Sequence, residues 1–232
     1  ATIIAGQSYT VQVDKSGWLA TGVYALPGEV VTLTVPSILV GKGYKFRING
    51  HVDNISNRSS WDRLPSGVST SFDIDATTVR IANSFGGTIY LEVGGGAATE
   101  TPPNLGSVSI VVNGAIEAPT FRLGEMTNAE WQTERLKPGA YTELISERLA
   151  MSVPSSWIRD LANPMELMTF WDDVVERMDW VGGVESLRTG PDRFNVDVQI
   201  SAGLLHAGYP IQGPTWASEE LVVLPELRRS GN

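Results

Sequence analysis

Short runs of alternating apolar and polar residues dominate the first half of the chain. Tyr9–Val13 and Val30–Val35 follow this pattern, which is typical of half-buried β-strands. Shorter runs of the same kind recur at close intervals: Tyr44–Ile48, Phe72–Ile74, Val79–Ala82, Ile89–Val93 and Val108–Val112. Turn residues separate them, among them Pro27-Gly28, Asn49-Gly50 and Asn113-Gly114. Many short strands with such turns between them predict an antiparallel β-sandwich or barrel.

The hydrophobic period becomes helical in the second half of the chain. Thr127 and Glu130 have the spacing of a capping box, and Asn163-Pro164 marks a second helix start. A helix opened by Pro154 and a strand over Phe194–Ser201 are also expected. The helix after Asn163 is predicted to bury one apolar face, with residues at steps of three and four: Leu161, Met165, Met168, Trp171, Val175 and Met178.

These patterns predict an α+β protein. We expect an N-terminal antiparallel β-sandwich in residues 1–115 and a mixed α/β region in residues 116–232. Gly94–Pro103 is small and polar and ends in proline. It is either a linker between domains or a long hairpin loop inside the sandwich, because Val108–Val112 resumes strand character after it.

Composition narrows the function classes. The chain has 232 residues, of which 42% are hydrophobic and 19% charged, as in folded globular proteins. Its net charge of -9 and the lack of a Lys/Arg cluster argue against nucleic acid and anionic lipid as partners. Its apolar runs are far shorter than the ~20 residues that cross a bilayer, so no membrane insertion is expected.

The chain contains no cysteine and begins at Ala1. Disulfides, thiol chemistry and Cys-based metal sites are therefore excluded. A first residue other than Met fits a processed, secreted product or a trimmed one. Asn54 and Asn57 open two overlapping N-glycosylation sequons, although triplets of this kind also arise by chance.

Histidine is scarce, since His51 and His206 are the only two in the chain. A zinc site needs several converging ligands, so these residues cannot form one by themselves. Neither histidine follows a recognisable nucleophile motif, and a structural or surface role is the default for each. The neighbouring carboxylates Asp172 and Asp173 cannot face one substrate from consecutive helical positions, and both are expected in solvent.

Two segments are candidates for ligand binding. Trp61, Asp62 and Arg63 form a possible glycan-binding loop, in which the indole stacks on a sugar. The alternative, which the sequence favours, is a hairpin with a salt-bridged rim and Trp61 packed inward. The second segment is Gln199–Pro210, where glycines, His206 and Tyr209 follow directly on a strand. Backbone often approaches a ligand closely at such places.

Several short sequence segments, in order along nearly the whole chain, resemble segments of the enhancin-like metallopeptidase family. Members of that family include baculovirus enhancins and gut-bacterial mucin peptidases. The segments are Trp18 with Thr21-Gly22-Val23-Tyr24, Pro27-Gly28-Glu29, Ile81–Tyr90, Ala118–Gly124, Val153-Pro154-Ser155, Phe170-Trp171-Asp172, and Asp197–Gly203 leading into His206–Pro210. Each segment is weak alone, whereas the ordered set is fairly specific.

The resemblance implies a β-sandwich followed by a thermolysin-like catalytic region. It also implies a zinc ion held by an H-E-x-x-H helix and a downstream Glu, with the Glu of the motif as general base. The implied substrates are mucin-like, O-glycosylated proteins. On this basis Gln199, His206 and Tyr209 are expected to border the active-site cleft, with His206 and Tyr209 as hydrogen-bond candidates on the substrate side and not as zinc ligands.

The sequence departs from the family because it contains no H-E-x-x-H motif. In relatives the zinc helix begins just after a segment that resembles Leu227–Asn232. The chain is therefore interpreted as a fragment, as half of a nicked enzyme, or as a short form that only binds. The first two imply the inactive N-terminal part of a secreted zinc peptidase, whose missing C-terminal catalytic segment is a partner. The third implies an extracellular glycan- or protein-binding module, adhesin-like or structural.

Overall fold

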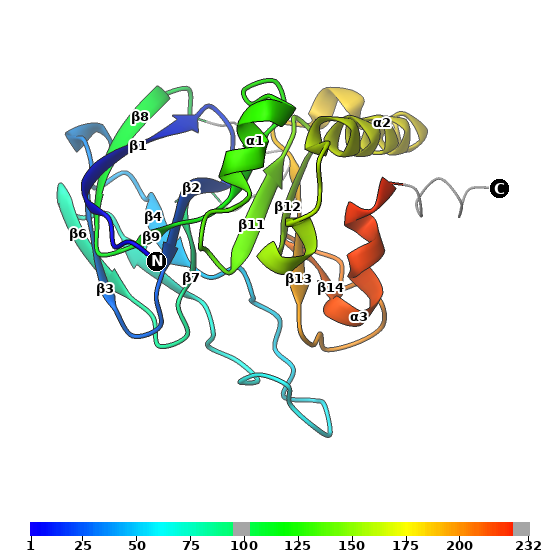
Figure 1. The fold of residues 1–232 in the computed structure, drawn as a ribbon, viewed down its shortest axis with the longest axis horizontal. Coiled ribbons are helices and arrows are strands. Elements are labelled where there is room, and N and C mark those ends of the chain that lie inside the picture. The colour runs from blue at the N-terminus through cyan, green and yellow to red at the C-terminus, as the bar shows by residue number, and fades with distance from the viewer. Residues whose placement is uncertain (95–102, 225–232) are drawn as a thin grey trace.

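The computed structural model describes residues 1–94 and 103–224. Two antiparallel sheets face each other at one end of the molecule, and a mixed sheet with the helices around it forms the other end (Figure 1). The predicted α+β class, a sandwich followed by a mixed α/β region, is confirmed. Among the described residues no helix is long and apolar enough to span a membrane.

The sandwich contains a four-stranded and a five-stranded sheet. Both bury alternate apolar side chains, such as Val31, Leu33 and Phe46, in one shared core. The first sheet has the order β1 (Ala5–Val13), β8 (Gly106–Asn113), β3 (Val30–Thr34), β6 (Thr78–Ala82). The second has the order β5 (Thr70–Asp73), β4 (Lys45–Ile48), β7 (Gly87–Val93), β2 (Gly17–Ala25), β9 (Ile116–Glu117).

The third sheet is mixed. Its order is β10 (Thr120–Arg122), β11 (Tyr141–Ile145), β12 (Leu149–Pro154), β13 (Asp192–Asp197), β14 (Ile211–Pro214). Strands β12, β13 and β14 are parallel, so their carboxyl ends lie at the same edge. The helices are α1 (Asn128–Glu134), α2 (Pro164–Gly182) and α3 (Thr215–Ser218), with 3-10 turns at Ser37–Leu39, Ser155–Ile158, Glu185–Leu187 and Glu219–Val222.

The predicted helix starts are confirmed. The Thr127 side chain accepts a hydrogen bond from the Glu130 amide and the Glu130 side chain accepts one from the Thr127 amide, which completes the capping box of α1. Asn163 caps α2 by accepting from the Glu166 amide at 3.1 Å. Gly183, with φ of 64°, ends α2 in the left-handed conformation that glycine adopts without strain.

Three local predictions are wrong. The segment after Pro154 forms only the 3-10 turn Ser155–Ile158. Only the middle of the apolar stripe on α2 packs against the sheet, so Met168 is buried while Met178 is 67% exposed. Asp172 is not simply solvated, because it accepts hydrogen bonds from the Ser146 hydroxyl (2.6 Å) and the Arg148 amide (3.1 Å) and so closes the β11–β12 turn.

Two other predictions are not decided by this structure. The interpretation of Gly94–Pro103 rests on residues 95–102, and that of Leu227–Asn232 on residues 225–232, which lie outside the described residues. The domain boundary at residue 115 also stays a prediction. The chain crosses this region without a break in sheet structure, since Ile116 and Glu117 pair with β2 before Thr120 opens β10.

A buried polar cluster, beside a small apolar cluster around Trp18 and Tyr90, joins the sandwich to the mixed sheet. Glu143 of β11 and Arg193 of β13 form a buried ion pair at 2.8 Å, with side chains 0% and 1% exposed. The Tyr90 hydroxyl of β7 donates to Glu143 at 2.7 Å, and Arg193 donates to the Trp18 carbonyl of β2 at 2.9 Å. Burial and the nearby carboxylate of Glu143 raise the pKa of Tyr90, so the phenol keeps its proton and stays a donor.

Removing the Tyr90 hydroxyl tests this junction. Tyr90→Phe takes one donor from a buried carboxylate, and a hydrogen bond to a charged group is worth roughly 1.5–3 kcal/mol. We expect the free energy of unfolding to fall by about that amount in a urea titration. Tyr44→Phe is the matched control, because the Tyr44 side chain makes no hydrogen bond within the described structure. Equal losses in the two variants would contradict the proposed junction.

Candidate functional site

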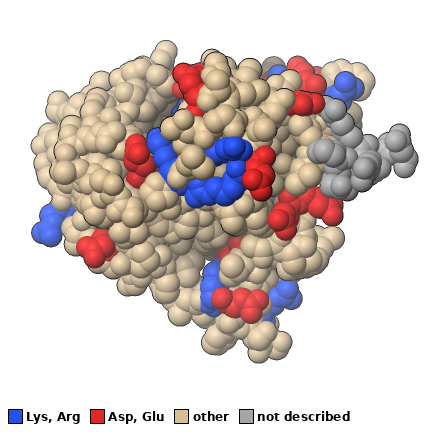
Figure 2. Space-filling view, viewed as in Figure 1, with Lys and Arg blue, Asp and Glu red and all other residues tan. Residues whose placement is uncertain are grey.

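The candidate site lies where a loop of the sandwich meets the segment after β13. Residues 51–68, here called the projecting loop, extend from the sandwich between β4 and β5 and form the lowest part of Figure 1. The 198–210 segment connects β13 to β14. Figure 2 shows acidic and basic side chains close together over the lower part of the molecule. Both segments carry residues that the sequence singled out.

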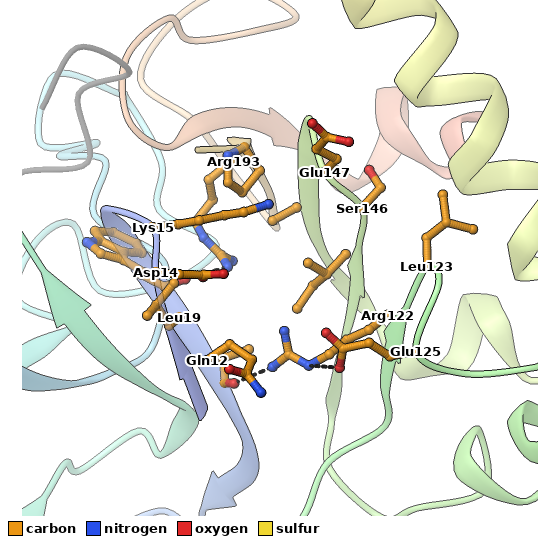
Figure 3. Close-up of a pocket in the computed structure, with 15 residues that line it drawn as sticks. Gln12, Asp14, Lys15, Leu19, Arg122, Leu123, Glu125, Ser146, Glu147 and Arg193 are labelled. Carbon is orange, nitrogen blue, oxygen red and sulfur yellow. Dashed lines mark hydrogen bonds and ion pairs between the residues drawn. The ribbon is translucent and has the colours of Figure 1, made fainter. Parts of the chain in front are cut away.

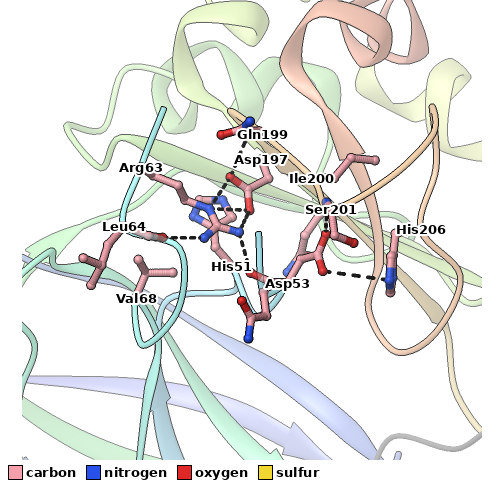
Figure 4. A network of polar contacts seen from close by, with 12 residues as sticks. His51, Asp53, Arg63, Leu64, Val68, Asp197, Gln199, Ile200, Ser201 and His206 are labelled. Carbon is pink, nitrogen blue, oxygen red and sulfur yellow. Dashed lines mark hydrogen bonds and ion pairs between the residues drawn. The ribbon is translucent and has the colours of Figure 1, made fainter. Parts of the chain in front are cut away.

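The strongest link between the two segments is the ion pair of Arg63 with Asp197 (Figure 4). Arg63 Nε lies 2.9 Å from both carboxylate oxygens of Asp197, and Arg63 Nη2 lies 2.7 Å from Oδ2. The two side chains are 10% and 0% exposed. Arg63 also donates to the carbonyl oxygens of Asp53 and Leu64, each at 2.8 Å. Its guanidinium is therefore fully engaged inside the protein.

Asp53 holds the 198–210 segment from a second point. Its Oδ2 accepts a hydrogen bond from the Ser201 amide at 2.6 Å, and its Oδ1 lies 3.8 Å from His206 Nε2. Asp53 is buried, whereas the His206 side chain is 45% exposed. The imidazole therefore faces solvent on one side and a fixed carboxylate on the other, an arrangement that suits a hydrogen-bonding role toward a bound molecule.

His51 has a structural place in the same network. Its Nε2 lies 2.9 Å from the carbonyl oxygen of Val196, and its ring packs edge-on against Tyr141. Burial lowers the pKa of His51, although the Asp197 carboxylate opposes this shift. The ring is thus neutral near pH 7, and the proton on Nε2 is donated to the carbonyl.

The structure brings the two predicted groups of site residues together. Gln199 accepts a hydrogen bond from the Asp62 amide and donates one to the Ser60 carbonyl, both at 2.9 Å. Trp61 is 57% exposed, so the favoured inward packing of this residue is wrong. Arg63 does form an ion pair, but its partner is the distant Asp197 and the pair is not the rim of a hairpin. The indole is exposed because the loop projects from the sandwich and has no core of its own to cover it.

Tyr209 lies at the junction between sandwich and mixed sheet. Its hydroxyl accepts a hydrogen bond from the Trp18 amide at 3.0 Å, and its ring packs edge-on against Trp18. Gly17 permits this approach, because a Cβ there would lie 2.2 Å from the Tyr209 hydroxyl oxygen. The expected substrate-side role of Tyr209 stays a prediction, as do those of Gln199 and His206 and the glycan-binding role of Trp61, Asp62 and Arg63.

The sequon asparagines lie on the projecting loop and are exposed. The Asn54 side chain accepts a hydrogen bond from the Ser56 amide at 2.9 Å. Asn57 donates from Nδ2 to the Ser201 carbonyl at 3.2 Å. Because a glycan would be attached to that same nitrogen, modification of Asn57 would alter one of the contacts that hold the 198–210 segment.

Sequence reasoning missed the acidic residues that organise this site. Asp53 was not singled out and Asp197 was included only within longer segments, yet they anchor both ends of the network. A signal existed for Asp197, because it lies inside the predicted strand Phe194–Ser201 and a carboxylate buried in a sheet is rare unless it is paired. Nothing local marks its partner Arg63, which lies 134 residues away in the sequence.

The described residues do not fit a zinc site. Within residues 1–94 and 103–224 no three His, Cys, Asp or Glu side chains group closely enough to hold a metal ion. The Nε2 atom of His51 points to a carbonyl oxygen, and His206 has only the Asp53 carboxylate beside it. We therefore assign no metal-dependent step to these residues.

The sequence matches two protein families. Residues 114–232 match peptidase M60, enhancin and enhancin-like, and residues 7–105 match the N-terminal domain of M60-like peptidases. Among curated proteins, the chain is 34% identical over 215 residues to a TRPM8 channel-associated factor homolog of Danio rerio. That alignment covers 92% of this chain and 23% of the relative, so the chain spans about a quarter of its length.

Solved structures with the same fold include two from bacteria. The first is the M60 catalytic domain of ZmpC from Clostridium perfringens in complex with the sialyl T antigen, with a TM-score of 0.66, 15% identity, and coverage of 91% of this chain and 46% of that one. The second is IMPa from Pseudomonas aeruginosa in complex with an O-glycopeptide, with a TM-score of 0.65, 17% identity, and coverage of 93% and 28%. At these identities the likeness shows the fold alone.

Loss of the Arg63 charge tests the network. Arg63→Gln leaves the fully buried Asp197 carboxylate without its cation, and breaking a buried pair in this way costs about 3–5 kcal/mol. We expect a loss of that size in the free energy of unfolding, measured by urea titration. Lys45→Gln is the control, since it removes a cation from an exposed pair with Asp73 that is worth less than about 1 kcal/mol. Similar losses for both variants would contradict the claim that the Arg63–Asp197 pair contributes more to stability than the Lys45–Asp73 pair.

Proposed function

The chain belongs to the enhancin and enhancin-like peptidase family, and from that premise we propose that it is the N-terminal portion of a secreted zinc metalloendopeptidase that cleaves mucin-type O-glycosylated proteins. The fold of nearly the whole chain recurs in solved structures of this family that hold the sialyl T antigen or an O-glycopeptide. Secretion is part of the proposal, because mucin-type substrates lie outside the cell.

In this proposal residues 1–232 position the substrate and do not activate the water. The family's enzymes are zinc peptidases, but this chain has no H-E-x-x-H motif and its described residues form no metal-binding group. The zinc and the general base would therefore come from further residues of the parent protein. The chain alone is expected to be inactive.

The observation that carries the proposal is the exposed His206, which lies beside the fixed carboxylate of Asp53 and is held by two backbone hydrogen bonds to Gln212 of β14. The same hydrogen-bonded network holds exposed Trp61 and Asp62 next to Gln199. An aromatic face with adjacent polar groups suits a sugar, so this surface would contact the glycan or the peptide of an O-glycosylated substrate.

A second candidate function is a non-catalytic binding module. It is favoured by the relatives named TRPM8 channel-associated factors, which align with nearly the whole chain. In that case the surface of Trp61 and His206 would bind a protein, such as a membrane channel, or a glycan. The stabilising network would serve this function equally well, since none of its contacts involves a metal.

Metal removal in the parent protein separates the two functions. We expect the intact parent to bind about one zinc per molecule, to cleave an O-glycosylated peptide but not its unglycosylated counterpart, and to lose and regain activity on chelation and zinc return. Residues 1–232 alone should hold no stoichiometric zinc. A parent that binds the glycopeptide with no zinc and no cleavage would establish the binding module instead.

His206→Ala in the parent tests the role of the imidazole. Loss of one well-placed hydrogen-bond donor lowers turnover by roughly 100-fold or more when it acts in the transition state. We expect that loss with unchanged zinc content, measured by peptide cleavage and metal analysis on the same samples. Lys42→Ala, an exposed change at the turn before β4, should leave turnover unaltered. Unchanged turnover in His206→Ala would remove His206 from the substrate-binding surface.

A further inference from the structure

A hollow lies between the sandwich and the mixed sheet, away from the network around Asp53 and Asp197. It has a volume of about 340 Å³, within the range of small-molecule sites. Its walls come from the β1–β2 turn, β2, β10, the β11–β12 turn and β13 (Figure 3). The cavity therefore exists only when both parts of the chain are assembled. None of the residues in the network around Asp53 and Asp197 lines it.

Cationic side chains enter the cavity from opposite walls. Figure 3 shows Lys15 pointing into the hollow from the β1–β2 turn and Arg122 pointing into it from β10. Within the described residues Lys15 is half-buried and makes no hydrogen bond or ion pair. Arg122 makes one hydrogen bond, from Nη2 to the Ala20 carbonyl at 2.7 Å, and a long 4.0 Å ion pair with Glu125.

These contacts leave most of the Arg122 donors without a partner. A guanidinium has five N–H groups in a planar fork that matches a carboxylate. Burial lowers the pKa of Arg122, and the nearby carboxylates of Glu125, Glu143 and Asp14 oppose this shift. An arginine of this kind remains protonated, so an anion in the cavity would supply the missing partner.

Arg193 supplies the inner wall of the cavity and carries an unused donor. Its side chain is 1% exposed and is held by Glu143 and the Trp18 carbonyl. Its Nε is buried and has no hydrogen-bond partner within the described structure. This nitrogen has almost no accessible surface, so Arg193 would act on a ligand in the cavity through its charge and not through a hydrogen bond from Nε.

The remaining lining residues limit the type of anion. Exposed carboxylates also line the hollow, namely Glu125, Glu147 and Asp14, of which Asp14 points into it near Lys15, so a polyanion would be repelled. Apolar side chains cover much of the rest of the wall, among them Trp18, Leu19, Leu123 and Ile145. Such walls suit an organic ligand with an apolar part better than they suit inorganic phosphate.

We propose that this cavity between the two sheets binds a small organic monocarboxylate, with its carboxylate between Lys15 and Arg122 and its apolar part against Trp18 and Ile145. The site is independent of the proposed peptidase function, because it needs neither zinc nor the 198–210 segment. A ligand there would contact both parts of the chain and would stabilise their arrangement in proportion to its occupancy.

The test is a titration of the protein with three probes at constant ionic strength: N-acetylglycine, its neutral amide and inorganic phosphate. The Trp fluorescence and the thermal midpoint report binding. N-acetylglycine is expected to bind saturably with a dissociation constant on the order of 1 mM, a reasonable affinity for a ligand of this size, and to raise the midpoint. The amide and phosphate should bind at least about tenfold more weakly.

Charge-removing variants locate the site. Lys15→Gln and Arg122→Gln should each weaken N-acetylglycine binding by about tenfold or more, while Arg80→Gln, an exposed change on β6, should not alter it. If Arg122→Gln fails to fold, Lys15→Gln still tests the proposal, because Lys15 has no hydrogen bond or ion pair to lose within the described structure. Absence of saturable binding, equal binding of the amide, tighter binding of phosphate, or normal binding by Lys15→Gln would each overturn the proposal.

Discussion

The buried ion pair between Glu143 and Arg193 is the interaction on which the rest of the structure depends. Two charges this deep lose their hydration, and only good geometry with further hydrogen bonds offsets that cost. Here Tyr90 and the Trp18 carbonyl supply those bonds from the sandwich. Because hydrogen bonds are directional and apolar contacts are not, this cluster fixes how the mixed sheet sits against the sandwich.

The candidate functional surface and the cavity both follow from that fixed junction. The projecting loop belongs to the sandwich, while its partners Asp197 and Ser201 belong to the mixed sheet and its connection. Lys15 and Arg122 face each other across the same junction. Neither arrangement exists within one part of the chain alone. Both parts that the sequence separates near residue 115 are therefore needed to form either arrangement.

The features that could be predicted from the sequence are those set by neighbouring residues, and the features that were missed depend on residues far apart in the chain. The capping box at Thr127 and the alternating strands were found because each depends on neighbouring residues. Strand β2 was missed because it is buried on both faces and so lacks alternation. The exposure of Trp61 and the pairing of Arg63 were beyond local patterns, since the partner Asp197 is 134 residues away. The approach of Lys15 and Arg122 to one cavity likewise has no sequence signature.

The same physical argument applies to relatives that are named as peptidases and to relatives that are named as channel-associated factors. Every contact that we find holding this half of the fold together is an apolar contact, a hydrogen bond or an ion pair between described residues, and none passes through a metal. Loss of zinc ligands elsewhere in a relative would therefore leave the sandwich, the junction and the surface around His206 intact. Under the proposed function, such a relative would lose its chemistry and keep the surface around His206, because other residues than the zinc ligands hold the fold together.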